Sequence, residues 1–259
     1  LWRTTNATLR MQRIETVMSE ICVVEVTTRR QRKAFIKFPN TLYAGCPYYV
    51  PALNMDEFDT LSPGRNPAFE NGEARLFMAY RGETAVGRVA ALLSRSANAK
   101  HNRSNVRFGW FDSVNDIAVA AALLGAVERW ARMLGMDTIT GPMGFNEFDK
   151  AGMLLEGFDS MPTMATYYNY PYYNELMESC GFVKEIDTVE YLIAGFRQGA
   201  FPQRLERLAQ WVKRRAGYRV LHFNRKKDLL DRANEIFALI GESYSDLYDS
   251  VPLSAKQQA

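Results

Sequence analysis

The most regular hydrophobic pattern lies near the middle of the chain. Val106–Phe111 is aromatic and β-branched, which is typical of a half-buried strand, and Asp112–Asp116 contains residues that cap helices and form turns. Ile117–Leu134 carries apolar residues at helical spacing, with charged residues on the opposite side. Gly135 can end that helix, and Met136–Thr140 is extended again. The pattern therefore predicts a strand, a helix and a parallel strand, a unit that often binds ligands in α/β proteins.

Upstream of this unit, the pattern predicts a β-hairpin and one strand followed by a helix. Two apolar runs, Ala74–Tyr80 and Ala85–Ser94, are joined by the short polar segment Arg81-Gly82-Glu83-Thr84, which indicates the hairpin. The remaining upstream expectations are a strand at Ile21–Val26, a helix at Arg29–Phe38 that Thr27 or Thr28 caps and Pro39-Asn40 ends, and irregular structure at Leu42–Asp59 and Ser96–Asn105.

Downstream of this unit, the pattern alternates between short strands and helices. The expected strands are Thr163–Tyr168, Phe182–Lys184, Val189–Ile193 and Tyr218–Phe223. The expected helices are Tyr172–Cys180, which Gly181 ends, the basic amphipathic segment Phe201–Ala216, and Leu229–Tyr244. For Phe201–Ala216, a solvent-exposed linker helix is favoured over a membrane or nucleic-acid surface.

Composition narrows the class of protein without changing this picture. The chain has 259 residues, 47% hydrophobic and 24% charged, as expected for a globular protein with a real core. Its net charge of +3 is dispersed, which argues against a nucleic-acid partner, and no apolar run approaches the length of a membrane span. Three widely spaced cysteines, Cys22, Cys46 and Cys180, predict reduced thiols and a cytoplasmic location.

The first residues are left out of the fold prediction. Leu1–Val17 is polar, begins without Met and lacks the apolar core of a signal peptide. Because Met11 or Met18 is a plausible start, we interpret residues 1–17 as an extension that is disordered, introduced during cloning or misassigned upstream sequence.

Several motifs resemble the GNAT N-acetyltransferase superfamily. Leu76–Val89 is similar to its β2–β3 hairpin, and Gly181-Phe182 after the Tyr172–Cys180 helix is similar to its closing helix and strand. Over about Met18–Gly195 the chain resembles more closely a bacterial group of uncharacterised GNAT-like proteins. The stretches that carry this second resemblance are Phe38-Pro39 to Val50-Pro51, Gly141-Pro142-Met143 to Gly157-Phe158-Asp159, and Tyr168-Asn169-Tyr170-Pro171-Tyr172-Tyr173.

The resemblance implies an α/β (α+β) fold with a mixed, strongly twisted sheet flanked by helices. It places a GNAT-like domain at residues 18–195, followed at 196–259 by a helical linker and the truncated start of a second GNAT-like unit. It also implies acyl transfer from acetyl-CoA or another acyl-CoA to the amine of a small-molecule acceptor.

In GNAT enzymes the CoA diphosphate binds an Arg/Gln-x-x-Gly-x-Gly/Ala turn ahead of the central helix, where backbone N–H groups meet the positive end of the helix dipole. Here that turn reads Asp112-Ser113-Val114-Asn115-Asp116-Ile117-Ala118, with two carboxylates and no Gly or Arg. A Tyr that protonates the leaving thiolate in many GNATs aligns with Met177. The residues that would form the cofactor cradle are Val114, Asn115, Asp116, Ile117 and Ala118.

Candidate acid–base groups follow the central unit, where α/β proteins place ligand sites. Glu147, Asp149 and Glu156 are possible bases that deprotonate the amine, with solvated loop carboxylates as the alternative, and we select Glu147 and Asp149. Tyr173 belongs to a dense tyrosine cluster and could donate a hydrogen bond, with simple packing as the alternative. The substrate-binding candidates are Asn146, Tyr168 and Asn169.

Other reactive residue types indicate no chemistry. Cys180 lies at a helix C-terminus, which disfavours a thiolate, and we expect it to pack. His101 and His222 have no metal-ligand spacing, so we predict no metal site.

Three functions remain open. The first is an acyl-CoA-dependent N-acyltransferase-like protein. The second is an inactive GNAT-like module that binds a small molecule or a protein. In the third, catalysis belongs to the second GNAT-like unit and this part of the chain is structural. The candidate partners are a small-molecule acyl acceptor and a second copy bound through the C-terminal segment. We expect neither nucleic acid nor a membrane as a partner.

Overall fold

The computed structural model describes residues 1–4, 21–146, 148–163, 166–191, 202–217 and 220–258. These residues form two compact units: the first comprises Leu1–Asp187 with Ser243–Ala259, and the second comprises Thr188–Glu242. The candidate site lies entirely in the first unit.

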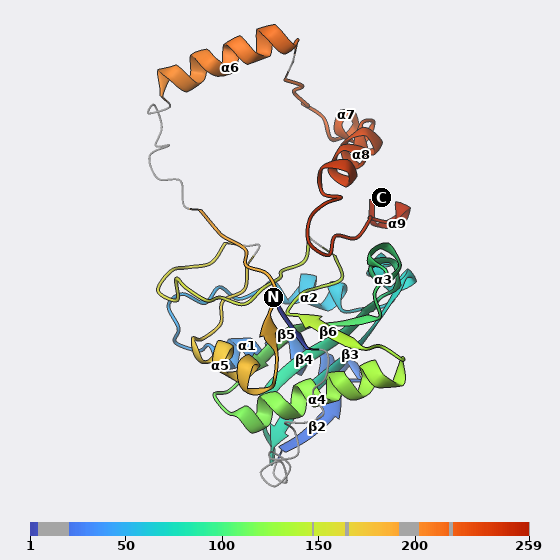
Figure 1. The fold of residues 1–259 in the computed structure, drawn as a ribbon, viewed down its shortest axis with the longest axis vertical. Coiled ribbons are helices and arrows are strands. Elements are labelled where there is room, and N and C mark those ends of the chain that lie inside the picture. The colour runs from blue at the N-terminus through green and yellow to red at the C-terminus, as the bar shows by residue number, and fades with distance from the viewer. Residues whose placement is uncertain (5–20, 147, 164–165, 192–201, 218–219, 259) are drawn as a thin grey trace. The chain divides into compact units, whose positions relative to one another are not determined.

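A mixed sheet forms the centre of the first unit (Figure 1). Its strand order among the described residues is β2-β3-β4-β5-β6-β1-β7, and every pairing is antiparallel except the parallel pair β5–β6. The mixed α/β fold that the sequence predicts is confirmed. The strands are β1 (Trp2–Thr4), β2 (Ile21–Glu25), β3 (Gly72–Arg81), β4 (Thr84–Ser94), β5 (Asn105–Ser113), β6 (Thr138–Gly141) and β7 (Val183–Lys184).

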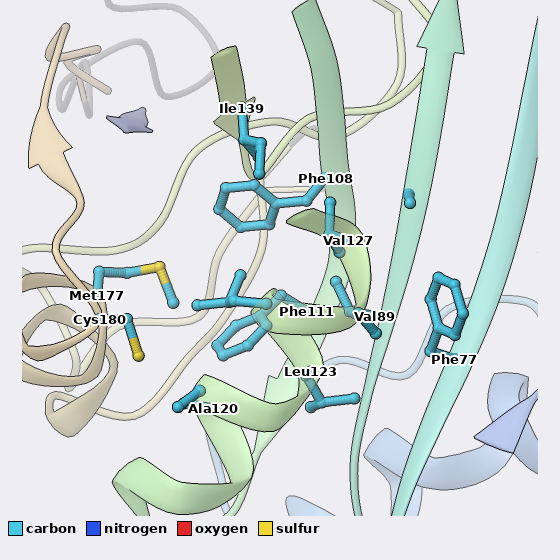
Figure 2. Packing of buried hydrophobic residues seen from close by; sticks show 14 of the residues in the cluster. Phe77, Val89, Phe108, Phe111, Ala120, Leu123, Val127, Ile139, Met177 and Cys180 are labelled. Carbon is cyan, nitrogen blue, oxygen red and sulfur yellow. The ribbon is translucent and has the colours of Figure 1, made fainter. Parts of the chain in front are cut away.

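Alternation along the strands gives the sheet a hydrophobic core on each face. In β3, Phe77 and Ala79 belong to one core cluster, whereas Leu76 and Met78 belong to the other, as a period of two requires. The first cluster packs against helices α4 (Ile117–Met133) and α5 (Tyr172–Ser179), and Figure 2 shows its packing. The second cluster packs against α1 (Arg29–Leu42).

The predicted strand–helix–strand unit is confirmed as β5, α4 and β6. Asp116 is the N-cap of α4, and its Oδ1 accepts a hydrogen bond from the Ala118 N–H at 2.8 Å. Twelve residues of α4 are buried, so packing rather than intrinsic propensity holds this helix in place.

Strand β5 contains a bulge at Trp110. Trp110 has φ +46°, which is unusual for a bulky residue, and the register with β4 shifts between Arg88 and Ala90. Because of the extra residue, Phe108 and Phe111 both belong to the first core cluster, while Trp110 belongs to the second. The bulge therefore changes which side chains at the end of β5 point into each of the two core clusters.

Helix α1 continues through the proline that was expected to end it. Thr28 is its N-cap, in a capping box with Gln31, but the helix runs four residues past the predicted end at Phe38, with Pro39 in its interior. The prediction of a helix end at Pro39-Asn40 is wrong. Pro39 has no N–H, so the carbonyl of Phe35 receives no i+4 hydrogen bond, and it accepts one from the Arg88 guanidinium instead at 2.8 Å.

Other short elements also differ from the prediction. Two helices lie in stretches expected to be irregular, and the strand β1 lies within residues 1–17, which the sequence analysis left out. No strand is formed by the described parts of Thr163–Tyr168, Val189–Ile193 and Tyr218–Phe223; residues 164–165, 192–193 and 218–219 lie outside the described residues. The additional helical elements of the first unit are α2 (Asn54–Thr60), the 3-10 helix η4 (Pro67–Glu70), α3 (Arg95–His101) and α9 (Ala255–Gln258).

In the second unit, the amphipathic helix is confirmed as α6 (Gln203–Ala216), which has no buried residue. The helix expected at Leu229–Tyr244 is divided into α7 (Lys226–Leu230) and α8 (Ala233–Ser243). Within the described residues of both units, no helix is long and apolar enough to cross a bilayer.

Candidate functional site

The candidate site lies where the two parallel strands stop pairing. Strands β5 and β6 are in register only from Asn105–Thr138 to Arg107–Thr140, whereas β5 continues to Ser113. Polar groups from β4, β5, α5 and the residue that follows α1 meet beside this end of β5, although its surroundings are apolar. We call them the Asp112 network: Tyr43, Arg88, Asp112, Ser113 and Tyr173.

Arg88 and Asp112 form a buried ion pair at the centre of the network. Arg88 Nε lies 2.8 Å from Asp112 Oδ2, and the two residues are only 5% and 7% exposed. Burial is the largest single influence on the pKa of Arg88 and lowers it, but the neighbouring groups that favour the charged form, Asp112 first among them, together raise the pKa overall. The bond from Arg88 to the Phe35 carbonyl fixes the guanidinium from the other side.

Two tyrosine hydroxyls connect this ion pair to the backbone of β5. Tyr43 Oη donates to Asp112 Oδ1 at 2.9 Å and lies 2.8 Å from Tyr173 Oη. The Ser113 N–H donates to Tyr173 Oη at 3.1 Å, and Tyr173 Oη lies 3.4 Å from Asp112 Oδ1. The pKa values of both phenols are raised well above 10, first by burial and then by the negative charge of Asp112. Both hydroxyls therefore keep their protons at neutral pH.

A small cavity adjoins this network. Its volume is about 20 Å³, which is room for about one water molecule, and Asp112, Tyr173, Asn169 and Tyr167 are among its lining residues. Burial is the largest reason why the pKa of Tyr167 is also raised well above 10. A substrate can enter this place only if its lining moves.

The predicted substrate residues have defined structural contacts. Asn169 is buried, and its Oδ1 accepts from the Leu154 N–H at 2.7 Å, while Tyr168 Oη donates to the Phe158 carbonyl at 3.1 Å. Both residues line the same cavity as Tyr173. The structure therefore brings three of the predicted site residues together.

Two further predicted site residues, Asn146 and Asp149, follow β6 in a segment that we call the acceptor loop, residues 144–149 without residue 147. Asp149 Oδ2 accepts from the Phe145 and Asn146 N–H groups at 2.7 and 3.3 Å. Asn146 Oδ1 in turn accepts from the Phe148 N–H at 2.9 Å. Burial raises the pKa of Asp149, although these amide bonds oppose the shift. Glu147 lies outside the described residues.

The predicted cofactor turn is a helix N-terminus that already holds a carboxylate. Asp116 caps α4 through Oδ1, and its Oδ2 forms an ion pair with Arg81. Asn115 and Ile117 are exposed, whereas Ala118 is buried and its N–H is bonded to Asp116. The Val114 N–H donates to the Val86 carbonyl at 3.0 Å. The five predicted residues do lie at the N-terminus of α4. However, the carboxylate of Asp116 occupies the position at the helix N-terminus where a CoA diphosphate was predicted to bind.

Sequence reasoning did not assign Tyr43, Arg88 or Asp112 to the site. The available signal was Arg88, a lone charge within the apolar run Ala85–Ser94, because a charge buried in a strand requires a partner. Tyr43 gave no comparable signal, since it follows a helix end that the sequence predicted too early.

A groove larger than this cavity lies elsewhere in the first unit. It has a volume of about 530 Å³ between β2, β3 and α4, and its lining includes Phe77, Trp130 and Arg75. None of the predicted site residues lines it.

The cysteine and metal predictions concern residues outside the Asp112 network. Burial raises the pKa of the Cys180 thiol to about 12, and Cys180 belongs to the first core cluster, so its thiolate is disfavoured. Among the described residues, His, Cys, Asp and Glu form no group of three or more that could hold a metal ion. The absence of a metal site stays a prediction.

Comparison with known proteins gives two relatives. The chain is 28% identical over 235 residues to Protein YghO of Escherichia coli (strain K12), which covers 90% of this chain and 59% of that protein. It is 31% identical over 174 residues to the bacterial ceramide synthase of Caulobacter vibrioides (strain NA1000 / CB15N), which covers 67% of this chain and 45% of that protein. The chain therefore spans about half the length of these relatives. No family model matches the chain.

Proposed function

We propose that this chain is the GNAT-like part of an acyltransferase that moves an acyl group from a thioester to an amine. The mixed sheet with its strand–helix–strand unit supports the GNAT-like assignment. The similarity to a protein named as a ceramide synthase supports acyl transfer. Since a ceramide is an amide of a fatty acid, that similarity also favours an amine as the acceptor, specifically one attached to a long alkyl chain.

The Asp112 network is the observation on which the proposal rests. Aminolysis of a thioester requires a group that takes a proton from the amine and a group that returns a proton to the leaving sulfur. Tyr173 Oη, Tyr43 Oη and Asp112 Oδ1 form a hydrogen-bonded series with steps of 2.8 and 2.9 Å. Such a series can do both, because a proton can move along it in either direction.

The network residues have the following roles in this proposal. Tyr173 takes the amine proton as it gives its own proton to Tyr43, and Tyr43 gives its proton to Asp112. When the carbon–sulfur bond breaks, the proton returns along the same path to the sulfur, so none is gained or lost. Arg88 keeps Asp112 in place throughout. The raised pKa values of Tyr43 and Tyr173 ensure that both hydroxyls start protonated.

The residues of the cofactor turn fit the diphosphate of CoA poorly. Asp116 already caps the helix, and its own charge is compensated by Arg81 rather than by a ligand. This observation favours the second candidate, a GNAT-like module that binds a small molecule or protein without catalysis. Acyl-CoA is nevertheless the donor to test first, because the mixed sheet is consistent with a GNAT-like fold and the sequence resembles that acyl-CoA-dependent superfamily.

Calorimetric titration with acetyl-CoA and palmitoyl-CoA, followed by a transfer assay with sphinganine, tests the proposal. We expect micromolar binding of one donor, and Tyr173→Phe should lower kcat by about 100-fold or more while leaving donor binding unchanged. Tyr170→Phe is the matched control, because Tyr170 is half-buried and its hydroxyl forms no hydrogen bond with the described residues. No binding of either donor up to about 1 mM, a binding free energy near 4 kcal/mol, would instead support the non-catalytic module.

A further inference from the structure

Strand β5 carries a second buried cation, Arg107, whose contacts lead from the acceptor loop to the C-terminal part of the first unit. Arg107 is 1% exposed, and its Nη1 donates to the carbonyls of Gly144 and Phe145 at 3.2 and 2.8 Å. Its Nη2 donates to the carbonyl of Asp249 at 2.9 Å and lies 2.9 Å from Asp249 Oδ2. One guanidinium therefore joins two segments about 100 residues apart in the sequence.

Burial, two ion pairs and an unusual backbone conformation fix the position of Asp249. Its side chain is 2% exposed, and it forms ion pairs with both Arg107 and Arg103. Its φ of +53° lies in the left-handed region, which Asp and Asn adopt more readily than most residues. The neighbouring Ser250 is also buried, and Lys100 Nζ donates to Ser250 Oγ at 2.6 Å.

The acceptor loop is consequently held from two sides. Asp149 binds the loop through its N–H groups, and Arg107 binds it through its carbonyls. The Cβ of Asp149 would lie 2.2 Å from a Cβ at Gly144, so the turn closes tightly there. In addition, Phe148 stacks on Tyr244, with ring centroids 6.0 Å apart.

We propose that Asp249 is a positioning residue for the acceptor loop. Its carboxylate fixes the guanidinium of Arg107, and Arg107 fixes residues 144 and 145, which precede the predicted acceptor residues Asn146 and Asp149. Residues 243–251 thus belong functionally to the acceptor site, although the sequence assigns them to a second unit. The loop's role in binding the amine rests on the proposed function, whereas its attachment to Asp249 does not.

Asp249→Asn tests this assignment, because Asn keeps the size and tolerates the backbone conformation but removes the charge. We expect amide hydrogens of residues 144–149 to exchange about tenfold faster or more, with no change in β3 and β4. The KM for sphinganine should rise about fivefold or more, while kcat and the KM for the acyl donor change less than twofold. Asp246→Asn is the matched control, because Asp246 is exposed and three residues away, and it should change neither quantity.

Each other result contradicts part of the assignment. Unchanged exchange of the acceptor loop in Asp249→Asn would overturn it. Faster exchange with an unchanged KM for sphinganine would show that the loop is attached to Asp249 but does not position the amine. If the wild-type protein acylates no amine, the proposed function fails and exchange alone decides the attachment.

A variant that does not fold leaves a test on the wild-type protein. Native-state hydrogen exchange in low urea should show residues 144–149 and 245–251 opening in a single step, with the same dependence on urea. Separate openings would overturn the attachment.

Discussion

Two arginine–carboxylate pairs in this protein show how burial changes the free-energy cost of losing one partner of an ion pair. Arg88 and Asp112 have side chains that are only 6% and 10% exposed, whereas Arg81 and Asp116 have side chains that are 45% and 29% exposed. Removing one partner of a buried pair leaves an uncompensated charge in a medium that solvates it poorly. Removing one partner of an exposed pair leaves a charge that water solvates.

We therefore expect Arg88→Met to lower the free energy of unfolding by about 3–5 kcal/mol, because Asp112 is left buried without its cation. Arg81→Met, the matched control, should lower it by about 1 kcal/mol or less. Urea denaturation of both variants at neutral pH and equal ionic strength measures the difference. Similar losses in the two variants would mean that Asp112 has enough solvent access to remain charged without Arg88.

At the scale of single elements, helix α1 shows which part of the fold the sequence could predict. Its start follows from a local signal, since Thr28 and Gln31 are three residues apart and complete a capping box. Its end does not follow from a local signal. Pro39 cannot donate to the Phe35 carbonyl, and the guanidinium of Arg88, 53 residues away in the sequence, donates to that carbonyl instead. A local rule fails there because a tertiary contact supplies the partner.

The capping box makes a prediction that separates two adjacent threonines. Thr28 Oγ1 accepts from the Gln31 N–H at 3.2 Å, so Thr28→Ala should lower the free energy of unfolding by about 1 kcal/mol. The Thr27 side chain makes only a 3.4 Å contact with Gln31 Oε1, and Thr27→Ala should have an effect within about 0.5 kcal/mol. Thermal or urea unfolding compares the two variants. An equal loss in both would assign the cap to Thr27 as much as to Thr28.

At the scale of the whole molecule, the sequence predicted the fold better than the site. Alternation and helical spacing identify β3, β4, β5 and α4 because each pattern is local. The site depends on residues that only the topology brings together, since Tyr43 and Tyr173 are 130 residues apart and still lie 2.8 Å from each other. Tyr173 was predicted from its dense tyrosine cluster. Arg88 and Asp112 could not be predicted in the same way, because only the pairing of β4 with β5 places them opposite each other.

Helices α4 and α6 offer a test of how stability is distributed between the two units. Helix α4 has 17 residues, of which 12 are buried, whereas α6 has 14 residues and none is buried. An isolated helix of about 12–15 residues is marginal in water, so α6 has little besides its own hydrogen bonds to keep it folded. Its apolar side chains, among them Leu208 and Trp211, are about half exposed.

We therefore expect the amide hydrogens of α6 to exchange within about tenfold of the rates of an unstructured peptide, and those of α4 to require almost complete unfolding. Mass-spectrometric exchange, corrected for the intrinsic rate of each sequence, makes the comparison. Equal protection of the two helices would mean that α6 is covered. Repeating the measurement at several protein concentrations then identifies the cover: protection that rises with concentration indicates a second copy bound through this segment, whereas protection independent of concentration indicates contacts within one chain.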